Sequence, residues 1–178
     1  MTNSTLETSY ISIQKLGKNI EIREYPAQIW ATVRGLEQDE AFNILSGFVL
    51  GKNERQEKIG MIFPIIAFNS NEGRTIAFIM SSRYRLRTLP KPYRDEIKFE
   101  LVAPKKMASI AFSGSLTPDS FDMNFRLLQE ILKNNKIPWI EPAYLFQYNE
   151  PRTPPFMRKN ECVVQIITWL NASIRWKG

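Results

Sequence analysis

Hydrophobic and polar residues alternate along two stretches of the chain that share one plan. Residues 20–35 contain an alternating strand, a break at Pro26, and a second alternating strand that ends at Gly35. Residues 97–114 repeat this order with a slightly longer connection. Each stretch is followed by one amphipathic helical pattern and then by two more strand-like runs. A β-β-α-β-β unit of this size cannot bury its apolar face alone, so the two copies are predicted to pack together, with a groove where they meet.

Two helices are predicted from apolar residues that recur at helical spacing. The first should run from about Asp39, near its N-cap, to Leu50. Its apolar stripe consists of Ala41, Phe42, Leu45, Phe48 and Val49. The second should be capped by Thr117, take Pro118 into its first turn and end near Asn134. The other alternating or apolar runs predict strands at 10–16, 61–68, 75–80, 143–148 and 162–169.

The composition fits one domain. Of the 178 residues, 43% are apolar, which is enough for a core. Residues 1–9 lack the basic and apolar segments of a signal peptide, and no apolar run is long enough to span a membrane. We therefore expect a single cytoplasmic domain over residues 1–178. Its two repeats should cover about 10–82 and 95–170, joined by the basic, proline-containing segment 83–94.

The absence of histidine narrows the function more than any other feature. The chain contains no histidine at all, which excludes Ser-His-Asp and Cys-His catalysis, the usual zinc sites and histidine-bound haem. The phosphate-binding and dinucleotide-binding glycine motifs are missing too. The single cysteine, Cys162, lies in a strand-like run and is expected to be buried packing. We expect neither catalytic residues nor a metal site.

The net charge of +6 raises the question of nucleic-acid binding. Basic residues gather with two tyrosines in segment 83–94, as Arg83, Arg85, Arg87, Lys91 and Arg94. Aromatic and basic side chains together can bind nucleic acid, or the segment could bind an acidic protein. However, Pro90 and Pro92 mark it as the connection between the repeats, where a solvated run of charge is typical. Because no recognised nucleic-acid-binding module accompanies the segment, we do not expect nucleic-acid binding.

Several segments, taken in order, resemble the SOUL haem-binding protein family. They are Ile20–Pro26, Phe42–Leu45 with Gly51–Asn53, Lys58–Pro64, Phe78–Tyr84, Leu89–Pro92 and Tyr148–Glu161. The last is the longest, reading Tyr-Asn-Glu-Pro-Arg-Thr-Pro-Pro-Phe-Met-Arg-Lys-Asn-Glu. The resemblance implies an α+β fold, a distorted antiparallel β-barrel built from two repeats and flanked by two α-helices. Gyrase-inhibitor-like proteins have a similar architecture.

The resemblance also implies a function, the non-catalytic binding of haem or another tetrapyrrole. The expected site is an apolar groove between the first helix and the loop that joins the last two strands. Arg158 and Lys159 would face the propionates. The full set of expected binding residues is Phe42, Leu45, Val49, Tyr148, Phe156, Met157, Arg158 and Lys159.

This chain departs from the family in one respect that concerns the iron. Some relatives have been proposed to use a histidine as an axial ligand, and none is present here. Met157, Tyr148 or Cys162 could ligate iron, but each matches an apolar or aromatic packing position. Binding would then depend on apolar burial and charge at the rim. On that basis, haem and metal-free porphyrin should bind with similar affinity.

Two other functions remain open from the sequence. The chain could be a sensor or hydrolase for bulky apolar, even cationic, small molecules on a gyrase-inhibitor-like fold. Such a site needs an aromatic cage and a carboxylate, for which the candidates are Tyr25, Trp30, Tyr148 and either Glu24 or Glu150. Alternatively, the basic segment 83–94 could bind an acidic partner.

Overall fold

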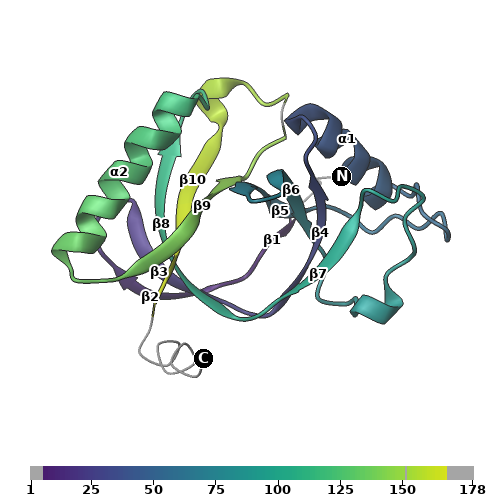
Figure 1. The fold of residues 1–178 in the computed structure, drawn as a ribbon, viewed down its shortest axis with the longest axis horizontal. Helices are drawn as coiled ribbons and strands as arrows, with labels where there is room; N and C mark the ends of the chain where they lie inside the picture. The colour runs from purple at the N-terminus through teal and green to yellow at the C-terminus, as the bar shows by residue number, and fades with distance from the viewer. Residues whose placement is uncertain (1–5, 151, 168–178) are drawn as a thin grey trace.

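The computed structural model describes residues 6–150 and 152–167. Within them the chain forms ten strands, two α-helices and two short 3₁₀ helices, drawn in Figure 1. The α-helices are α1 (Gln38–Val49) and α2 (Pro118–Asn134), and the 3₁₀ helices are η1 (Leu86–Thr88) and η2 (Pro155–Met157). The strands are β1 (Leu6–Glu7), β2 (Ile11–Lys15), β3 (Ile20–Tyr25), β4 (Gln28–Arg34), β5 (Ile62–Ser70), β6 (Gly73–Ile79), β7 (Lys98–Val102), β8 (Lys105–Ser113), β9 (Trp139–Gln147) and β10 (Lys159–Ile166).

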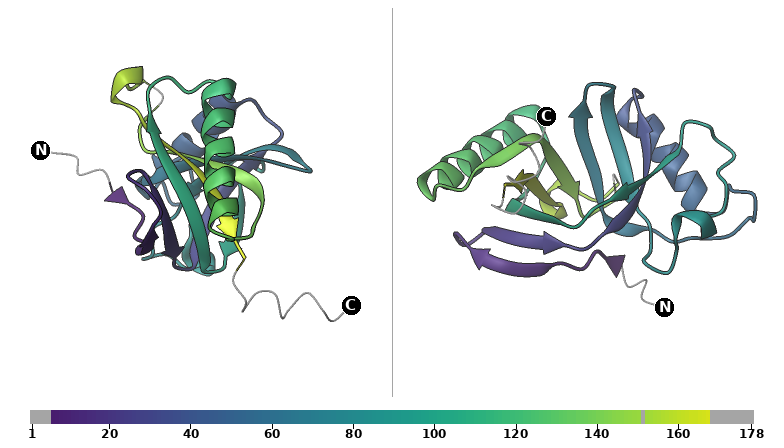
Figure 2. Two further views of the ribbon diagram at one scale, coloured as in Figure 1. Left: turned by 90° about the vertical axis from the view of Figure 1, so that its left-hand side faces the viewer. Right: turned by 60° about the horizontal axis from the view of Figure 1, so that its bottom comes forward.

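All of these strands belong to one strongly curled sheet. Its order is β2-β3-β8-β10-β9-β5-β6-β4-β7, and β1 adds to β5 as the one parallel pair among the described strands. Both α-helices pack on the outer face of the curl, α1 over β4 and β6 and α2 over β8, β9 and β10 (Figures 1 and 2). The predicted fold class, a distorted antiparallel barrel with two flanking helices, is confirmed in the form of a curled half-barrel.

Two long bent ribbons connect the halves of the molecule. β3 pairs with β8, with Tyr25 opposite Lys105, and β4 pairs with β7, with Gln28 opposite Val102. Three residues separate Tyr25 from Gln28, and three separate Val102 from Lys105, so the register continues without a shift across the bend. Pro26 and Pro104 lie within the bend, where the ladder is interrupted because proline has no N–H to donate.

The two halves have the same topology. In one half the order is β5-β6-β4-β7 with α1 following β4, and in the other it is β9-β10-β8-β3 with α2 following β8. The halves meet where β5 pairs with β9. The halves are not the two predicted repeats themselves, because β3 of the first predicted repeat lies in the half with α2 and β7 of the second lies in the half with α1. The repeat boundaries at 10–82 and 95–170 stay a prediction, and residues 168–170 lie outside the described part of the chain.

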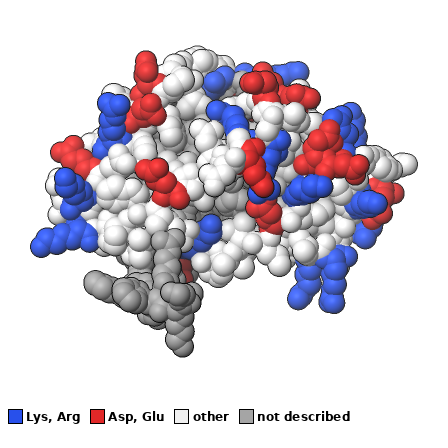
Figure 3. Space-filling model, viewed as in Figure 1, with Lys and Arg blue, Asp and Glu red and all other residues white. Residues whose placement is uncertain are grey.

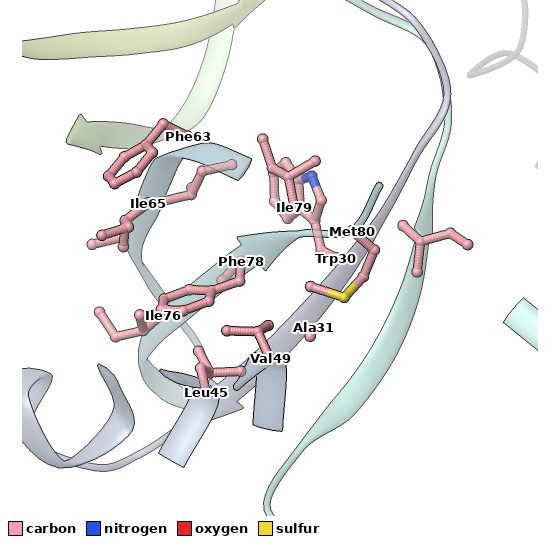
Figure 4. Close-up of a cluster of buried hydrophobic side chains, with 14 of the residues drawn as sticks. Trp30, Ala31, Leu45, Val49, Phe63, Ile65, Ile76, Phe78, Ile79 and Met80 are labelled. Carbon is pink, nitrogen blue, oxygen red and sulfur yellow. The ribbon is translucent and has the colours of Figure 1, made fainter. Parts of the chain in front are cut away.

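The apolar core lies mainly between the sheet and the two helices. Under α1 the side chains of Leu45 and Val49 face Ile76 and Phe78 of β6 (Figure 4). Under α2 a second cluster contains Leu128 and Leu132 of the helix together with Cys162 of β10 and its neighbours. These two clusters hold each helix on the sheet.

The predicted elements agree with the structure to within a few residues. The second helix has the expected cap, because the Thr117 side chain accepts a hydrogen bond from the Ser120 N–H at 3.1 Å and Pro118 takes the first position. The first helix begins at Gln38 rather than Asp39. The strand expected at 162–169 starts earlier, at Lys159, and residues 168–169 lie outside the described residues. In the described part of the chain, no helix has both the length and the apolar composition of a membrane span.

Candidate ligand-binding site

A hollow of about 510 Å³ lies between α1 and the loop that joins β9 to β10. Its volume falls within the roughly 300–1,000 Å³ that is typical of small-molecule sites. Its exposed lining is mostly apolar. We call it the α1 hollow, and its lining residues are Asp39, Phe42, Asn43, Ser46, Val49, Leu50, Met61, Glu150 and Arg152.

Helix α1 turns its apolar stripe toward the core and the margin of that stripe toward the α1 hollow. Leu45 is completely buried, whereas Phe42 is only half-buried. The Phe42 ring packs edge-on against Phe78, with the ring centroids 5.5 Å apart. Val49, two helical turns after Phe42, borders both the core and the α1 hollow. The helix therefore supplies a fixed apolar wall.

A buried asparagine fixes the segment that follows α1. The Asn53 side chain is 0% exposed, and its Nδ2 donates to the carbonyl oxygens of Phe48 at 3.1 Å and Glu57 at 2.8 Å. Its Oδ1 accepts hydrogen bonds from the N–H groups of Arg55 at 3.2 Å and Glu57 at 3.1 Å. All the polar atoms of this amide are thus used to shape the turn.

The same segment returns to the helix before β5 begins. The Ile59 N–H donates to the carbonyl oxygen of Val49 at 2.9 Å. This bond holds the chain beside the last turn of α1, and Met61 follows two residues later. Leu50 and Met61 are the apolar residues that this segment contributes to the α1 hollow, and Leu50 is 66% exposed.

Five of the nine residues that line the α1 hollow are polar or charged, and the hydroxyl of one of them lacks a partner among the described residues. The hydroxyl oxygen of Ser46 is buried and makes no hydrogen bond to any described residue. Such an unpaired buried hydroxyl is unfavourable unless a ligand or water pairs with it. The charged lining residues are Arg152 from the loop and the carboxylates Asp39 and Glu150.

The sequence pattern of the SOUL heme-binding protein family matches residues 6–165, which is most of the chain. The chain belongs to the SOUL heme-binding protein family. No curated protein matches the sequence.

Solved structures similar to this SOUL-family chain share its fold at very low sequence identity. A hydrolase from Listeria innocua is 9% identical with a TM-score of 0.61, and the match covers 87% of this chain and 94% of that one. A hydrolase encoded by lin2189 from the same organism is 8% identical with a TM-score of 0.61, over 92% and 100% of the two chains. The EcmrR C-terminal domain is 10% identical with a TM-score of 0.53, over 84% and 97%. These likenesses show the fold alone.

Of the binding residues expected on helix one and at the end of β9, two line the α1 hollow and two are buried away from it. Phe42 and Val49 line the α1 hollow, and Leu45 lies beneath them in the core. Tyr148 is buried after β9, where its hydroxyl donates to the Glu161 carboxylate at 2.7 Å. Burial, and next the nearby Glu161 carboxylate, strongly raise the pKa of this phenol. Tyr148 therefore presents no free hydroxyl to the α1 hollow.

The apolar pair expected to cover the groove lies at the surface. Phe156 is 80% exposed and Met157 is 62% exposed. Both belong to η2, which packs near β8, on the α2 side of the loop, whereas the start of the loop reaches α1 (Figure 1). The first residues of the loop, Glu150 and Arg152, approach α1 instead.

The two expected rim cations have partners within the protein. Arg158 Nε donates to the carbonyl oxygen of Thr153 at 2.7 Å. Lys159 Nζ lies 4.0 Å from the centroid of the Tyr148 ring and 3.9 Å from the Glu7 carboxylate. Arg152 takes the rim position beside the α1 hollow.

The inner face of the curl carries an aromatic row between the two halves. Its members are Trp30, Phe68, Tyr144, Phe146 and Tyr25, with neighbouring ring centroids 5.0–6.5 Å apart. The row leaves little space, because the gap beside Trp30 and Lys105 holds only about 20 Å³. That volume is about enough for one water molecule.

The charge in this inner gap does not suit a cationic ligand. Lys105 Nζ lies 5.9 Å from the ring centroids of both Trp30 and Tyr144, and burial lowers the pKa of this lysine. No carboxylate is among the residues that line the gap. Of the acids considered from the sequence, Glu24 directly precedes Tyr25 on β3, opposite Lys106, and is not among the residues that line the gap, and Glu150 lines the α1 hollow. Within the described residues, no cluster of acidic or cysteine side chains is arranged to hold a metal ion.

Two arginines of the basic segment 83–94 are bound to other groups of the protein. Arg83 donates to the Ile59 carbonyl oxygen at 3.2 Å and to the Tyr84 hydroxyl at 2.9 Å, and that hydroxyl in turn donates to Glu57. Arg94 pairs with Glu96 at 2.6 Å. On the face drawn in Figure 3, acidic and basic side chains are interspersed rather than gathered by sign. The net positive charge does not form one continuous basic surface on this face.

Sequence reasoning missed the residues that contribute polar and sulfur atoms to the α1 hollow. Ser46 lies on the predicted helix, but nothing in its pattern indicates an unpaired hydroxyl. The pattern predicts Met61 in a strand and in no site, and it indicates Arg158 and Lys159, not Arg152, as the cations of the rim. The sequence offers one signal for them: Ser46 lies on the expected binding helix, and Arg152 lies in the loop expected to cover it.

Proposed function

We propose that this SOUL-family protein binds a tetrapyrrole, haem or a metal-free porphyrin, in the α1 hollow and carries it without catalysis. The family membership supports the class of ligand. The position is supported by one observation above all: α1 and the loop after β9 border an open hollow of about 510 Å³ whose exposed lining is mostly apolar. Apolar walls of this kind bind a flat ring through burial of apolar surface.

The residues around the α1 hollow fit such a ligand. Phe42, Val49 and Leu50 provide apolar contact along one wall. Arg152 offers a guanidinium for a propionate carboxylate, a pairing that is strong because both partners are charged and planar. Asp39 and Glu150 would repel propionates, so the propionate edge is placed at Arg152. Ser46 would pair its orphan hydroxyl with a polar atom of the ligand.

The loop residues expected from the sequence have a secondary place in this proposal. Arg158 at the end of the same loop as Arg152, and Lys159 at the start of β10, add positive charge that attracts an anionic ligand over a distance. Phe156 and Met157 lie on its exposed turn, at η2. Direct contact with the ring is assigned to Phe42 and Val49 from the expected set.

A titration with protoporphyrin IX, followed by quenching of tryptophan emission, tests the proposal. Leu50→Asp places a carboxylate on the apolar wall at a position that is 66% exposed, so folding should be preserved. We expect it to weaken binding about tenfold or more. Leu127→Asp is the matched control, at a position on α2 that is 45% exposed, and should leave affinity unchanged. Absence of quenching in the unmodified protein, or equal weakening by both variants, contradicts the proposal.

A further inference from the structure

The side chains that can coordinate haem iron are few in this protein. Proteins hold haem iron through histidine, cysteine, methionine or tyrosine. Histidine is absent. Cys162 is fully buried in the cluster under α2, and burial raises the pKa of its thiol to about 12, so it offers no thiolate to the α1 hollow.

Of these residue types, only Met61 lines the α1 hollow within the described part of the chain. The tyrosines of the chain line other surfaces, and Tyr148, the nearest along the loop, has its hydroxyl bound to Glu161. Met157 lies on η2 and is 62% exposed, away from α1. Among the described residues, Met61 is therefore the candidate iron ligand of this site.

The backbone around Met61 holds it in place before any ligand arrives. Asn53 ties the preceding turn to the end of α1 through both ends of its amide. The Ile59 N–H then bonds to the Val49 carbonyl oxygen at 2.9 Å. Directly after Met61, Ile62 begins β5 and is paired with Ile79 of β6. These bonds fix the backbone of Met61 between a helix and a strand, and its side chain is half-buried against the core, so the chain loses little further freedom on binding.

We propose that the thioether sulfur of Met61 coordinates the iron of haem bound in the α1 hollow. This inference rests on the proposed function and adds to it a source of selectivity for haem over metal-free porphyrin. A thioether is neutral, so it needs no deprotonation and carries no charge into an apolar site. As a soft ligand it favours iron in the reduced state, as methionine does in cytochromes that have a raised potential.

Parallel titrations with haem and with metal-free protoporphyrin IX separate the iron bond from the rest of binding. The protein should bind haem about tenfold more tightly than protoporphyrin, and Met61→Leu should remove that difference while leaving the affinity for protoporphyrin unchanged. Leucine conserves the volume of methionine, so the fold should persist. The Soret band of the haem complex should also shift in Met61→Leu. Met157→Leu is the matched control and should change neither the ratio of the haem and protoporphyrin affinities nor the Soret band of the haem complex.

The outcomes distinguish the two proposals. If protoporphyrin and haem bind the unmodified protein equally, and Met61→Leu changes neither affinity nor the Soret band, the Met61 assignment is wrong while the α1 hollow remains the site. If neither porphyrin binds, the proposed function itself fails. If Met157→Leu rather than Met61→Leu removes the preference for haem, the ligand is on η2 and the assignment is overturned.

Discussion

Arg23 and Glu161 form a buried two-point ion pair that crosses over β8. Arg23 Nη1 and Nη2 donate to the two carboxylate oxygens of Glu161 at 2.7 Å and 2.8 Å, and the residues are 138 positions apart in the sequence. β3 and β10 are not neighbours in the sheet, because β8 lies between them. The side chains are 6% and 0% exposed. Tyr148 and Tyr25 add hydrogen bonds at 2.7 Å and 3.1 Å.

Removing one partner of this pair should destabilise the protein strongly. Arg23→Met leaves the Glu161 carboxylate buried without its partner, and this is expected to lower the free energy of unfolding by about 3–5 kcal/mol. The double variant Arg23→Met with Glu161→Leu removes both fully buried charges and should recover a large part of the loss. Glu21, which pairs with Arg23 Nε at 2.6 Å and is 18% exposed, keeps its hydrogen bond from Ser12. Urea unfolding of the three proteins measures these differences.

A surface pair provides the control for that experiment. Arg94 and Glu96 are 2.6 Å apart with side chains that are 55% and 39% exposed. Arg94→Met should change the free energy of unfolding by less than about 1 kcal/mol. Equal costs for Arg23→Met and Arg94→Met would show that the buried pair has no special role in holding the curl.

The same network should make stability fall at alkaline pH. Burial raises the pKa of Tyr25 to about 12, from an ordinary value of 10.0, and raises the pKa of Tyr148 further in the same direction. At a pH between 10 and 12, the unfolded chain loses the phenolic proton of Tyr25 while the folded protein keeps it. The stabilisation is thus complete below about pH 10 and is lost as the pH rises through 12. Each tyrosine contributes a slope of about 1.4 kcal/mol per pH unit.

Replacing one of the two tyrosines isolates that effect. Tyr148→Phe should reduce the loss of stability above pH 10 by about 1.4 kcal/mol per pH unit, measured by urea unfolding at a series of pH values. Tyr93→Phe, at a position that is 62% exposed, controls for tyrosine replacement away from the network. An unchanged slope in Tyr148→Phe would contradict the assignment of the buried phenol.

The thiol of Cys162 should be inert in the folded protein. It is 0% exposed, and burial raises its pKa to about 12, so the reactive thiolate is neither accessible nor formed near neutral pH. A maleimide reagent should label the protein in denaturant and fail to label it under native conditions. Rapid native labelling, followed by mass spectrometry, would place Cys162 in an accessible site.

Leu45 and Phe156, both expected from the sequence to contact the ligand, should differ sharply in their effect on stability. Leu45→Ala removes a completely buried side chain beneath the α1 hollow and should cost about 2–5 kcal/mol. Phe156→Ala alters a side chain that is 80% exposed and should stay within about 0.5 kcal/mol. Thermal or urea unfolding measures both. A large cost for Phe156→Ala would mean that η2 packs against the protein more closely than its exposure indicates.

Much of the fold could be predicted because it depends on local signals. Thr117 and Pro118 mark the start of α2 by capping chemistry that acts within one turn. The alternating runs at 20–25 and 28–34 indicate strands because side chains alternate between the two faces. The repeated order of these elements predicts two repeats, but it does not predict that the sheet places β3 beside β8 and β7 beside β4.

The site was predicted only in part, because it depends on contacts between distant residues. Phe42 and Val49 belong to a helical stripe that periodicity reveals, and both line the α1 hollow. Where the loop after β9 turns is decided by packing against α1 and β8, which no local pattern specifies. The sequence therefore placed Phe156 over a groove when the chain instead brings Arg152 to α1. Arg23 and Glu161 are likewise invisible as a pair until β3 and β10 are folded around β8.

The position of the bound ring is the central claim, and methyl NMR spectra recorded with and without zinc protoporphyrin test it most directly. A porphyrin ring current shifts the resonances of the groups it covers. We predict the largest shifts at the methyl groups of Val49, Leu50 and Met61. Shifts confined to Ile79 and Met107 at the inner aromatic row, or to Leu127 on α2, would contradict the assignment of the α1 hollow as the tetrapyrrole site.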